Sequence, residues 1–137
     1  LDLTTLAEKS ADDDMLTSLT DPDKMGDWLT ADDLDFYVNE FTQSGFAGPL
    51  NYYRNHNLTW ELNANKPTQI HQPALFVAGE RDGVIAMAGP ALESMPNFVK
   101  DLRTNVLIPE IGHWTQQEAP DAVNGYLLDW LAGLSQS

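Results

Sequence analysis

The stretch "PALFVAGERD" (Pro73–Asp82) decides the fold of this chain. Its centre, Ala74–Ala78, is a short apolar run closed by Gly79, a pattern typical of a strand buried on both faces of a parallel sheet. A second apolar run, "NVLIPEIG" (residues 105–112), predicts another buried strand at Val106–Ile108. The two runs together predict neighbouring parallel strands.

Helices are predicted between and after these strands. The segment "GPALESMPNFVKDL" between them allows a helix from Pro90, although Pro96 interrupts its pattern, and Pro120 opens a C-terminal helix. The apolar residues of that last helix recur at helical spacing: Val123, Tyr126, Leu127, Trp130, Leu131 and Leu134. Strand, crossover, strand and helix form a βαβα pattern. Because two strands leave both sheet edges open, we expect the end of a larger doubly wound α/β sheet.

The first half of the chain predicts helices without strands. Thr30 and Asp33 form a capping-box pattern, and Gly45 stands where a helix C-cap glycine belongs. Between these two signals, apolar residues recur at helical spacing: Leu34, Tyr37, Val38 and Phe41. The helix face that holds Tyr37 is predicted to pack in the core. Two further helices are predicted, over residues 1–19 and 49–62. We therefore expect a helical lid over residues 1–66 and a portion of an α/β core over residues 67–137.

Composition excludes several classes of partner. The chain of 137 residues has 21 acidic and 7 basic side chains, a net charge of −14, so nucleic acid and anionic membrane are not expected partners. It has no cysteine, which excludes disulfides, thiolate nucleophiles and Cys-ligated zinc and fits a cytoplasmic location. No apolar run reaches the length of a membrane span. A chain that begins at Leu1 without Met is expected to be a fragment.

Two titratable residues follow the ends of the two predicted strands. Asp82 comes just after the first strand and His113 just after the second, and ligands gather beyond the carboxyl ends of such strands. If the loops touch, Asp82 would orient the imidazole and stabilise its cation. The alternatives are structural: Asp82-Gly83 as an ordinary turn pair, and His113 as a cap of the helix at Pro120 or a residue packed under Trp114.

Other candidate residues have weaker patterns. His56 and His71 have no partner pattern and are expected to be surface or structural, and no histidine spacing indicates a metal site or a cofactor. Tyr52 and Tyr53 read as core or interface residues from spacing alone. No nucleophile elbow of the G-x-S-x-G type follows a strand, since Ser44 follows a helix.

Three ordered segments resemble the C-terminal part of the α/β-hydrolase-fold epoxide hydrolases. "GFAGPLNYYRNHNLTWEL" (residues 45–62) is similar to that family's lid segment, with its Tyr-Arg-Asn step. "PALFVAGERDGVI" (residues 73–85) resembles the strand and turn that carry the charge-relay acid. "IPEIGHWTQQEAP" (residues 108–120) resembles the histidine loop. The match runs from about Asp27 to Leu134.

The resemblance implies roles for three residues. His113 would be the general base that activates water, Asp82 would orient it, and Tyr53 would donate a hydrogen bond to the epoxide oxygen as the ring opens. In the family, a carboxylate attacks the epoxide, and hydrolysis of the resulting ester gives a vicinal diol. The nucleophile, the oxyanion-hole loop and a second lid tyrosine normally lie upstream, and Tyr37 is not assigned to that last role. The implied partners are a small epoxide and the N-terminal part of the core, in the same or another chain.

Two other classes of function stay open at this point. One is a related α/β hydrolase, such as a haloalkane dehalogenase or an esterase, which the upstream nucleophile, Asp or Ser on an elbow, together with the residues that line the lid would distinguish. The other is a truncated, non-catalytic binding module or interaction fragment. An unpaired sheet edge in such a module would need a partner chain.

Overall fold

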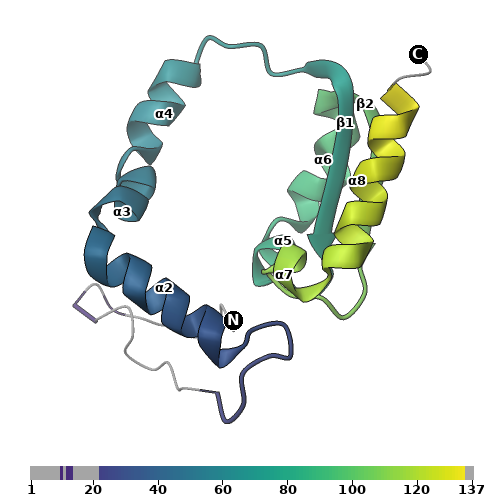
Figure 1. Cartoon of the computed structure of the whole chain (residues 1–137). Coiled ribbons are helices and arrows are strands. Elements are labelled where there is room, and N and C mark those ends of the chain that lie inside the picture. The colour runs from purple at the N-terminus through teal and green to yellow at the C-terminus, as the bar shows by residue number, and fades with distance from the viewer. Residues whose placement is uncertain (1–9, 11, 14–21, 135–137) are drawn as a thin grey trace. The chain divides into compact units, whose positions relative to one another are not determined.

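A computed structural model describes residues 10, 12–13 and 22–134 of the chain (Figure 1). The chain divides into a helical unit, Met25–Thr68, and a unit built around the sheet that includes Gln69–Ser137. The helix predicted over residues 1–19 lies, except for residues 10, 12 and 13, outside the described residues. Whether the helical unit acts as a lid stays a prediction.

The first described helix, α2 (Ala31–Ser44), begins and ends where the sequence predicts. The Thr30 hydroxyl accepts the backbone N–H of Asp33 at 3.2 Å, and the Asp33 carboxylate accepts the backbone N–H of Thr30 at 3.0 Å. These bonds form a capping box. At the other end, Gly45 has φ 65°, and its N–H donates to the Phe41 carbonyl. A positive φ is easy for glycine, which explains why the helix ends there.

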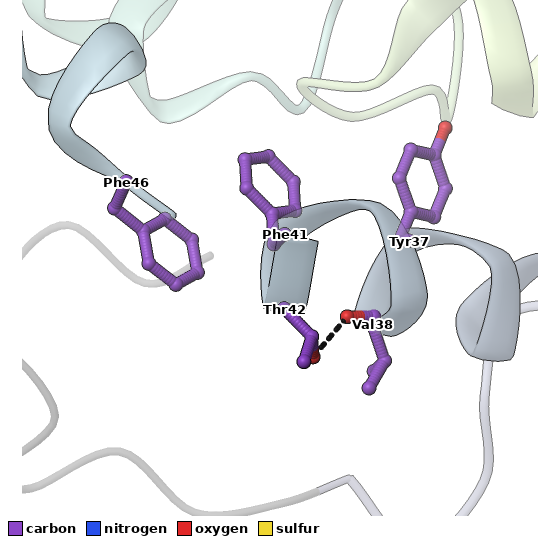
Figure 2. Close-up of a pocket in the computed structure, with 5 residues that line it drawn as sticks. All are labelled: Tyr37, Val38, Phe41, Thr42 and Phe46. Atoms are coloured by element: carbon purple, nitrogen blue, oxygen red, sulfur yellow. Dashed lines mark hydrogen bonds between the residues drawn. The ribbon is translucent and has the colours of Figure 1, made fainter. Parts of the chain in front are cut away.

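The apolar face of α2 is not buried in a core, so the interpretation of Tyr37 as a core residue is wrong. Tyr37 is 46% exposed, and Leu34 and Val38 are exposed as well. Within the helical unit, α2, α3 and α4 follow one another as successive helices and not as a bundle, so α2 gains little cover from the other two (Figure 1). Part of the face lines a shallow apolar pocket of about 310 Å³ that Figure 2 shows. Its lining residues are Tyr37, Val38, Phe41, Thr42 and Phe46.

The single helix predicted over residues 49–62 is instead two helices, α3 (Ala47–Arg54) and α4 (His56–Asn63). The break is at Asn55. Its side-chain amide donates to the Asn51 carbonyl at 2.9 Å, beside a backbone N–H that donates to the same oxygen. Asparagine side chains compete in this way for helix carbonyls, which favours a stop over continuation.

The sheet has two parallel strands in the described residues, β1 (Ile70–Gly79) and β2 (Val99–Ile108). Both begin earlier than predicted and end at or next to the predicted residue. The prediction that β1 is buried on both faces is wrong for most of its length. Its first three residues are exposed, the next five are half-buried, and only Ala78 and Gly79 are buried. Burial is concentrated at the carboxyl end, where the loops pack.

The helices of the sheet unit complete the predicted βαβα order. The crossover holds α6 (Gly89–Phe98), which starts near Pro90 as predicted and contacts β2. The last helix, α8 (Pro120–Leu134), contacts both strands and covers part of the sheet (Figure 1). Two short helices that the sequence does not predict follow the strands: α5 (Gly83–Met87) after β1 and α7 (Thr115–Glu118) after β2.

Candidate active site at the carboxyl ends of the strands

The loops that follow β1 and β2 are joined by backbone hydrogen bonds. The N–H of Glu80 donates to the Ile108 carbonyl at 3.0 Å, and the N–H of Arg81 donates to the Ile111 carbonyl at 2.8 Å. The side chains of Arg81 and Glu110 also form an ion pair on the surface. Backbone hydrogen bonds therefore continue past the ends of the strands and hold the two loops together.

Gly79 allows this close approach. A Cβ at this position would lie 2.2 Å from the Gly112 carbonyl oxygen and 2.3 Å from that of Ile111. Both distances are far inside van der Waals contact, and backbone atoms cannot move away as a flexible side chain can. The glycine at the end of β1 is therefore a packing requirement of the histidine loop.

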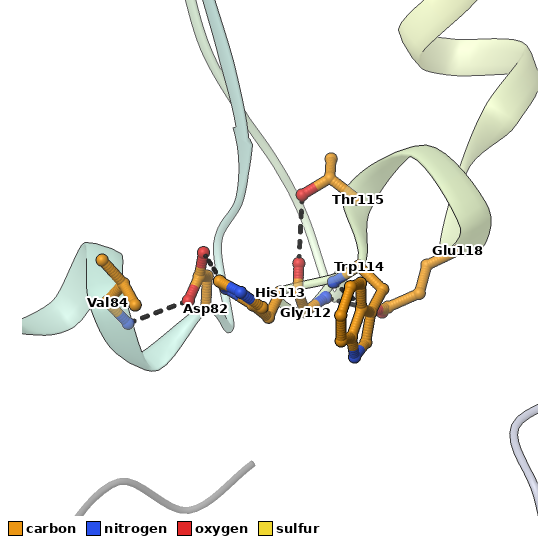
Figure 3. Close-up of polar contacts among 7 residues, drawn as sticks. All are labelled: Asp82, Val84, Gly112, His113, Trp114, Thr115 and Glu118. Carbon is orange, nitrogen blue, oxygen red and sulfur yellow. Dashed lines mark hydrogen bonds and ion pairs between the residues drawn. The ribbon is translucent and has the colours of Figure 1, made fainter. Parts of the chain in front are cut away.

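Asp82 makes two contacts with its two carboxylate oxygens (Figure 3). Oδ1 accepts the backbone N–H of Val84 at 2.8 Å and caps the first turn of α5. Oδ2 lies 3.0 Å from Nδ1 of His113. Asp82 is buried, with only 8% of its surface exposed. Asp82 and Gly83 are not an ordinary turn pair, because Asp82 is the N-cap of α5 and Gly83 is its first residue, whereas the contact with Nδ1 agrees with the interpretation of Asp82 as a partner for histidine.

His113 presents the rest of its ring to solvent. Because a carboxylate only accepts hydrogen bonds, Nδ1 carries a proton, and Nε2 is the basic nitrogen of the neutral ring. The side chain is 51% exposed, so a water molecule or a ligand can approach it. The Trp114 ring lies edge-on to the imidazole, with centroids 5.4 Å apart. Asp82 and Trp114 thus hold the histidine from two sides.

The histidine loop has a second set of contacts, which was not predicted from the sequence. The Glu118 carboxylate accepts the backbone N–H of Gly112 at 2.7 Å and that of Trp114 at 3.0 Å. The Thr115 hydroxyl donates to the Gly112 carbonyl at 3.1 Å, and Thr115 is buried. The sequence "GHWTQQE" does place an acidic residue shortly after the histidine. Only the folded loop shows which backbone N–H groups its carboxylate accepts.

Tyr53 lies on α3, in the helical unit, and is described with that unit. It is 66% exposed, so of the two structural interpretations of Tyr53 the core one is wrong, and the interface one stays a prediction. Its ring contacts those of Tyr52 and His56, each with a centroid distance of 5.6 Å. This small aromatic cluster holds the ring while it leaves the side chain accessible.

Within the described part of the chain, neither of the two other histidines belongs to a metal-binding group. Among the residues that the structure describes, no set of three or more His, Asp or Glu side chains is arranged to hold a metal ion. His71 lies at the exposed start of β1, and His56 packs against the two tyrosines. None of the described helices combines the length and apolarity that a membrane crossing needs.

The known proteins to which this chain is similar include several epoxide hydrolases. No protein-family model matches the chain. Epoxide hydrolase B of Mycobacterium tuberculosis is 40% identical over 114 residues, which is 82% of this chain and 32% of that protein. The structure of epoxide hydrolase A from Mycobacterium thermoresistibile matches with a TM-score of 0.74 and 44% identity, over 82% of this chain and 35% of that one. A variant of an epoxide hydrolase from Vigna radiata matches with a TM-score of 0.74 and 34% identity, over 82% and 37%.

These similarities confirm the predicted resemblance and fold class. The chain spans about a third of the length of the relatives it matches. Its two parallel strands, with their flanking helices and the preceding helical unit, therefore correspond to part of an α/β-hydrolase fold.

Proposed function

Because this chain resembles the α/β-hydrolase-fold epoxide hydrolases over 82% of its length, we propose that it is the part of such an enzyme that activates water. The reaction converts a small epoxide to a vicinal diol through an alkyl-enzyme ester. The observation that carries the proposal is the hydrogen bond of 3.0 Å between Asp82 and His113, at the carboxyl ends of two parallel strands. General bases of α/β enzymes are built at such ends.

His113 acts in the second step. Its Nε2 takes a proton from water while the water oxygen adds to the ester carbonyl carbon. The tetrahedral intermediate then breaks its bond to the diol oxygen, which takes the proton back from the imidazolium, and the carboxylic acid left on the enzyme loses its proton to water, which restores the carboxylate. The buried Asp82 carboxylate keeps Nδ1 protonated and stabilises the imidazolium between these two transfers.

Tyr53 acts in the first step. A carboxylate attacks one carbon of the epoxide, the C–O bond breaks, and negative charge develops on the ring oxygen. The phenol of Tyr53 donates a hydrogen bond to that oxygen, which then takes up a proton from water and becomes a hydroxyl group of the alkyl-enzyme ester. Its exposure and its ring contacts with Tyr52 and His56 support this role, because they leave the hydroxyl available and the ring held.

Two further parts of the proposal concern the rest of the enzyme. The nucleophilic carboxylate comes from the N-terminal part of the α/β core, in the same or another chain, since the matched relatives are about three times as long as the aligned region. A cytoplasmic location stays an expectation from the cysteine-free sequence.

The test is to trap the ester in the complete protein that contains this chain. With His113→Gln the first step still proceeds but the ester is not hydrolysed, so steady-state turnover falls by about a hundredfold or more. Mass spectrometry then finds the protein heavier by the full mass of the epoxide, since ring opening is an addition. His71→Gln, at the exposed start of β1, is the matched control and retains turnover.

Each alternative outcome has a defined meaning. Full turnover by the His113→Gln protein would reject the assignment. Turnover of a haloalkane with release of halide, without turnover of an epoxide, would identify a haloalkane dehalogenase, and turnover of an ester alone would identify an esterase. No reaction of the unmodified complete protein with any of the three substrate classes would favour a binding module.

A further inference from the structure

The backbone on both sides of His113 is held by one carboxylate. Glu118 Oε2 accepts the N–H of Gly112, at 2.7 Å, and Oε1 accepts the N–H of Trp114, at 3.0 Å (Figure 3). The residues before and after the histidine are thus both bonded to the same side chain. Hydrogen bonds of an N–H to an ionised acceptor are stronger than neutral ones, so this is a firm attachment.

The surrounding contacts close the loop into a compact unit. The N–H of Glu118 donates back to the Trp114 carbonyl at 2.8 Å, and the Thr115 hydroxyl donates to the Gly112 carbonyl at 3.1 Å. A Cβ at position 112 would lie 3.0 and 3.2 Å from the two carboxylate oxygens, so the glycine leaves room for the acid. Glu118 is half-buried, which limits competition from water.

We propose that Glu118 is a positioning residue that sets the backbone of His113 so that its ring meets Asp82. The inference rests on the proposed function for its kinetic consequence, but not for its structural one. Asp82 controls the ring through Nδ1 at 3.0 Å, and Glu118 controls the peptide groups from which that ring projects. A small displacement of a catalytic group costs a large factor in rate, so two separate attachments are of use here.

Two substitutions of Glu118 separate the effect of its hydrogen bonds from the effect of its negative charge. Glu118→Gln keeps the size of the side chain but replaces one acceptor oxygen by an NH2 group, which faces an N–H donor and cannot accept it. Glu118→Asp keeps the negative charge but is one methylene too short to reach both amides. Asp121→Asn, at an exposed position at the start of α8, removes one nearby negative charge as the matched control.

The first measurement needs no substrate. Proton NMR of the complete protein follows exchange with water of the His113 Nδ1 proton and of the amide protons of Gly112 and Trp114. We expect exchange of all three to speed up by roughly tenfold to a hundredfold in the Glu118→Gln and Glu118→Asp proteins, as the loss of a charge-assisted hydrogen bond implies. The Asp121→Asn protein keeps the unmodified rates.

The second measurement divides the reaction into its steps. Single-turnover kinetics should show ester hydrolysis slowed by about tenfold or more in both Glu118 variants, with ring opening little changed, because only the second step uses His113. A uniform loss of both steps with a lower melting temperature would mean that Glu118 has a structural role only, and would overturn the proposal.

The two measurements also distinguish the failure of this inference from the failure of the proposed function. If the complete protein does not turn over epoxides but His113 Nδ1 exchange responds to Glu118, the positioning role stands and the epoxide assignment does not. If epoxides are turned over but neither Glu118 variant changes exchange or ester hydrolysis, the positioning role is rejected. An effect of Glu118→Gln without one of Glu118→Asp would assign the effect to charge and also reject it.

Discussion

Asp82 serves the fold and the candidate site with different oxygens of one carboxylate. Its Oδ1 caps α5 and its Oδ2 meets His113. A helix-capping role and a contact with histidine are therefore not exclusive for Asp82 in this chain. The cap also has a consequence for the site, since it limits rotation of the carboxylate and directs the second oxygen to the imidazole.

The glycine at the end of β1 gives a prediction at the same scale. Gly79→Ala places a Cβ against two backbone carbonyls, at 2.2 and 2.3 Å, and we expect it to destabilise the protein by about 3 kcal/mol, as overpacking of a filled site does. Gly125→Ala, in the middle of α8 with open space around it, is the control and should stabilise by about 0.5–1 kcal/mol. Chemical denaturation of both variants measures the difference. Equal stability of the two would contradict the packing argument.

At the scale of elements, the N-terminus of α2 makes a prediction about pH. The hydrogen bonds from Thr30, first from its side chain and then from its backbone, lower the pKa of the Asp33 carboxyl below its ordinary value of 3.8. A folded-state pKa below the unfolded one means that the carboxylate stabilises the folded helix above that ordinary value. This contribution is lost as the pH falls through the lowered pKa.

Asp33→Asn should therefore lower the melting temperature near neutral pH, and its gap to the unmodified protein should close as the pH is taken below the ordinary carboxyl range. Asp35→Asn, exposed on the same helix, removes the same charge without the capping contacts and serves as the control. Thermal melts followed by circular dichroism give the comparison. A gap for Asp33→Asn that is as wide in acid as at neutral pH would contradict the capping argument.

At the scale of the whole molecule, the proposal gives the helical unit a part of its own in the reaction, through Tyr53. Tyr53→Phe removes one O–H group and keeps the ring that packs against Tyr52 and His56. We expect ring opening to slow by about a hundredfold, the typical cost of one lost donor to a developing oxyanion, and ester hydrolysis to change little. Rapid-quench measurement of the two steps in the complete protein tests this.

Tyr52→Phe is the matched control, since Tyr52 is the neighbouring tyrosine and is exposed to a similar extent. It should leave both steps close to those of the unmodified enzyme. Slow ring opening in the Tyr52 variant with normal ring opening in the Tyr53 variant would move the proposed role by one residue along α3.

Local patterns in the sequence were enough for much of the fold. The capping box at Thr30, the stop at Gly45 and the βαβα order of the second half depend on residues close in the chain, so they are readable without the tertiary structure. The placement of Asp82 and His113 at one sheet edge followed from the same order, because neighbouring parallel strands end on the same side.

What neighbouring residues cannot show is which atoms meet across the loops. Only the tertiary structure decided that Gly79 abuts the carbonyl of Gly112, that Asp82 divides its oxygens between a cap and His113, and that Glu118 holds the loop by two amides. It also decided that Tyr37 is exposed, since helical spacing identifies an apolar face but not what covers it. The physical reason is that secondary structure depends on short-range backbone sterics and hydrogen bonds, whereas burial and contact depend on segments far apart in the chain.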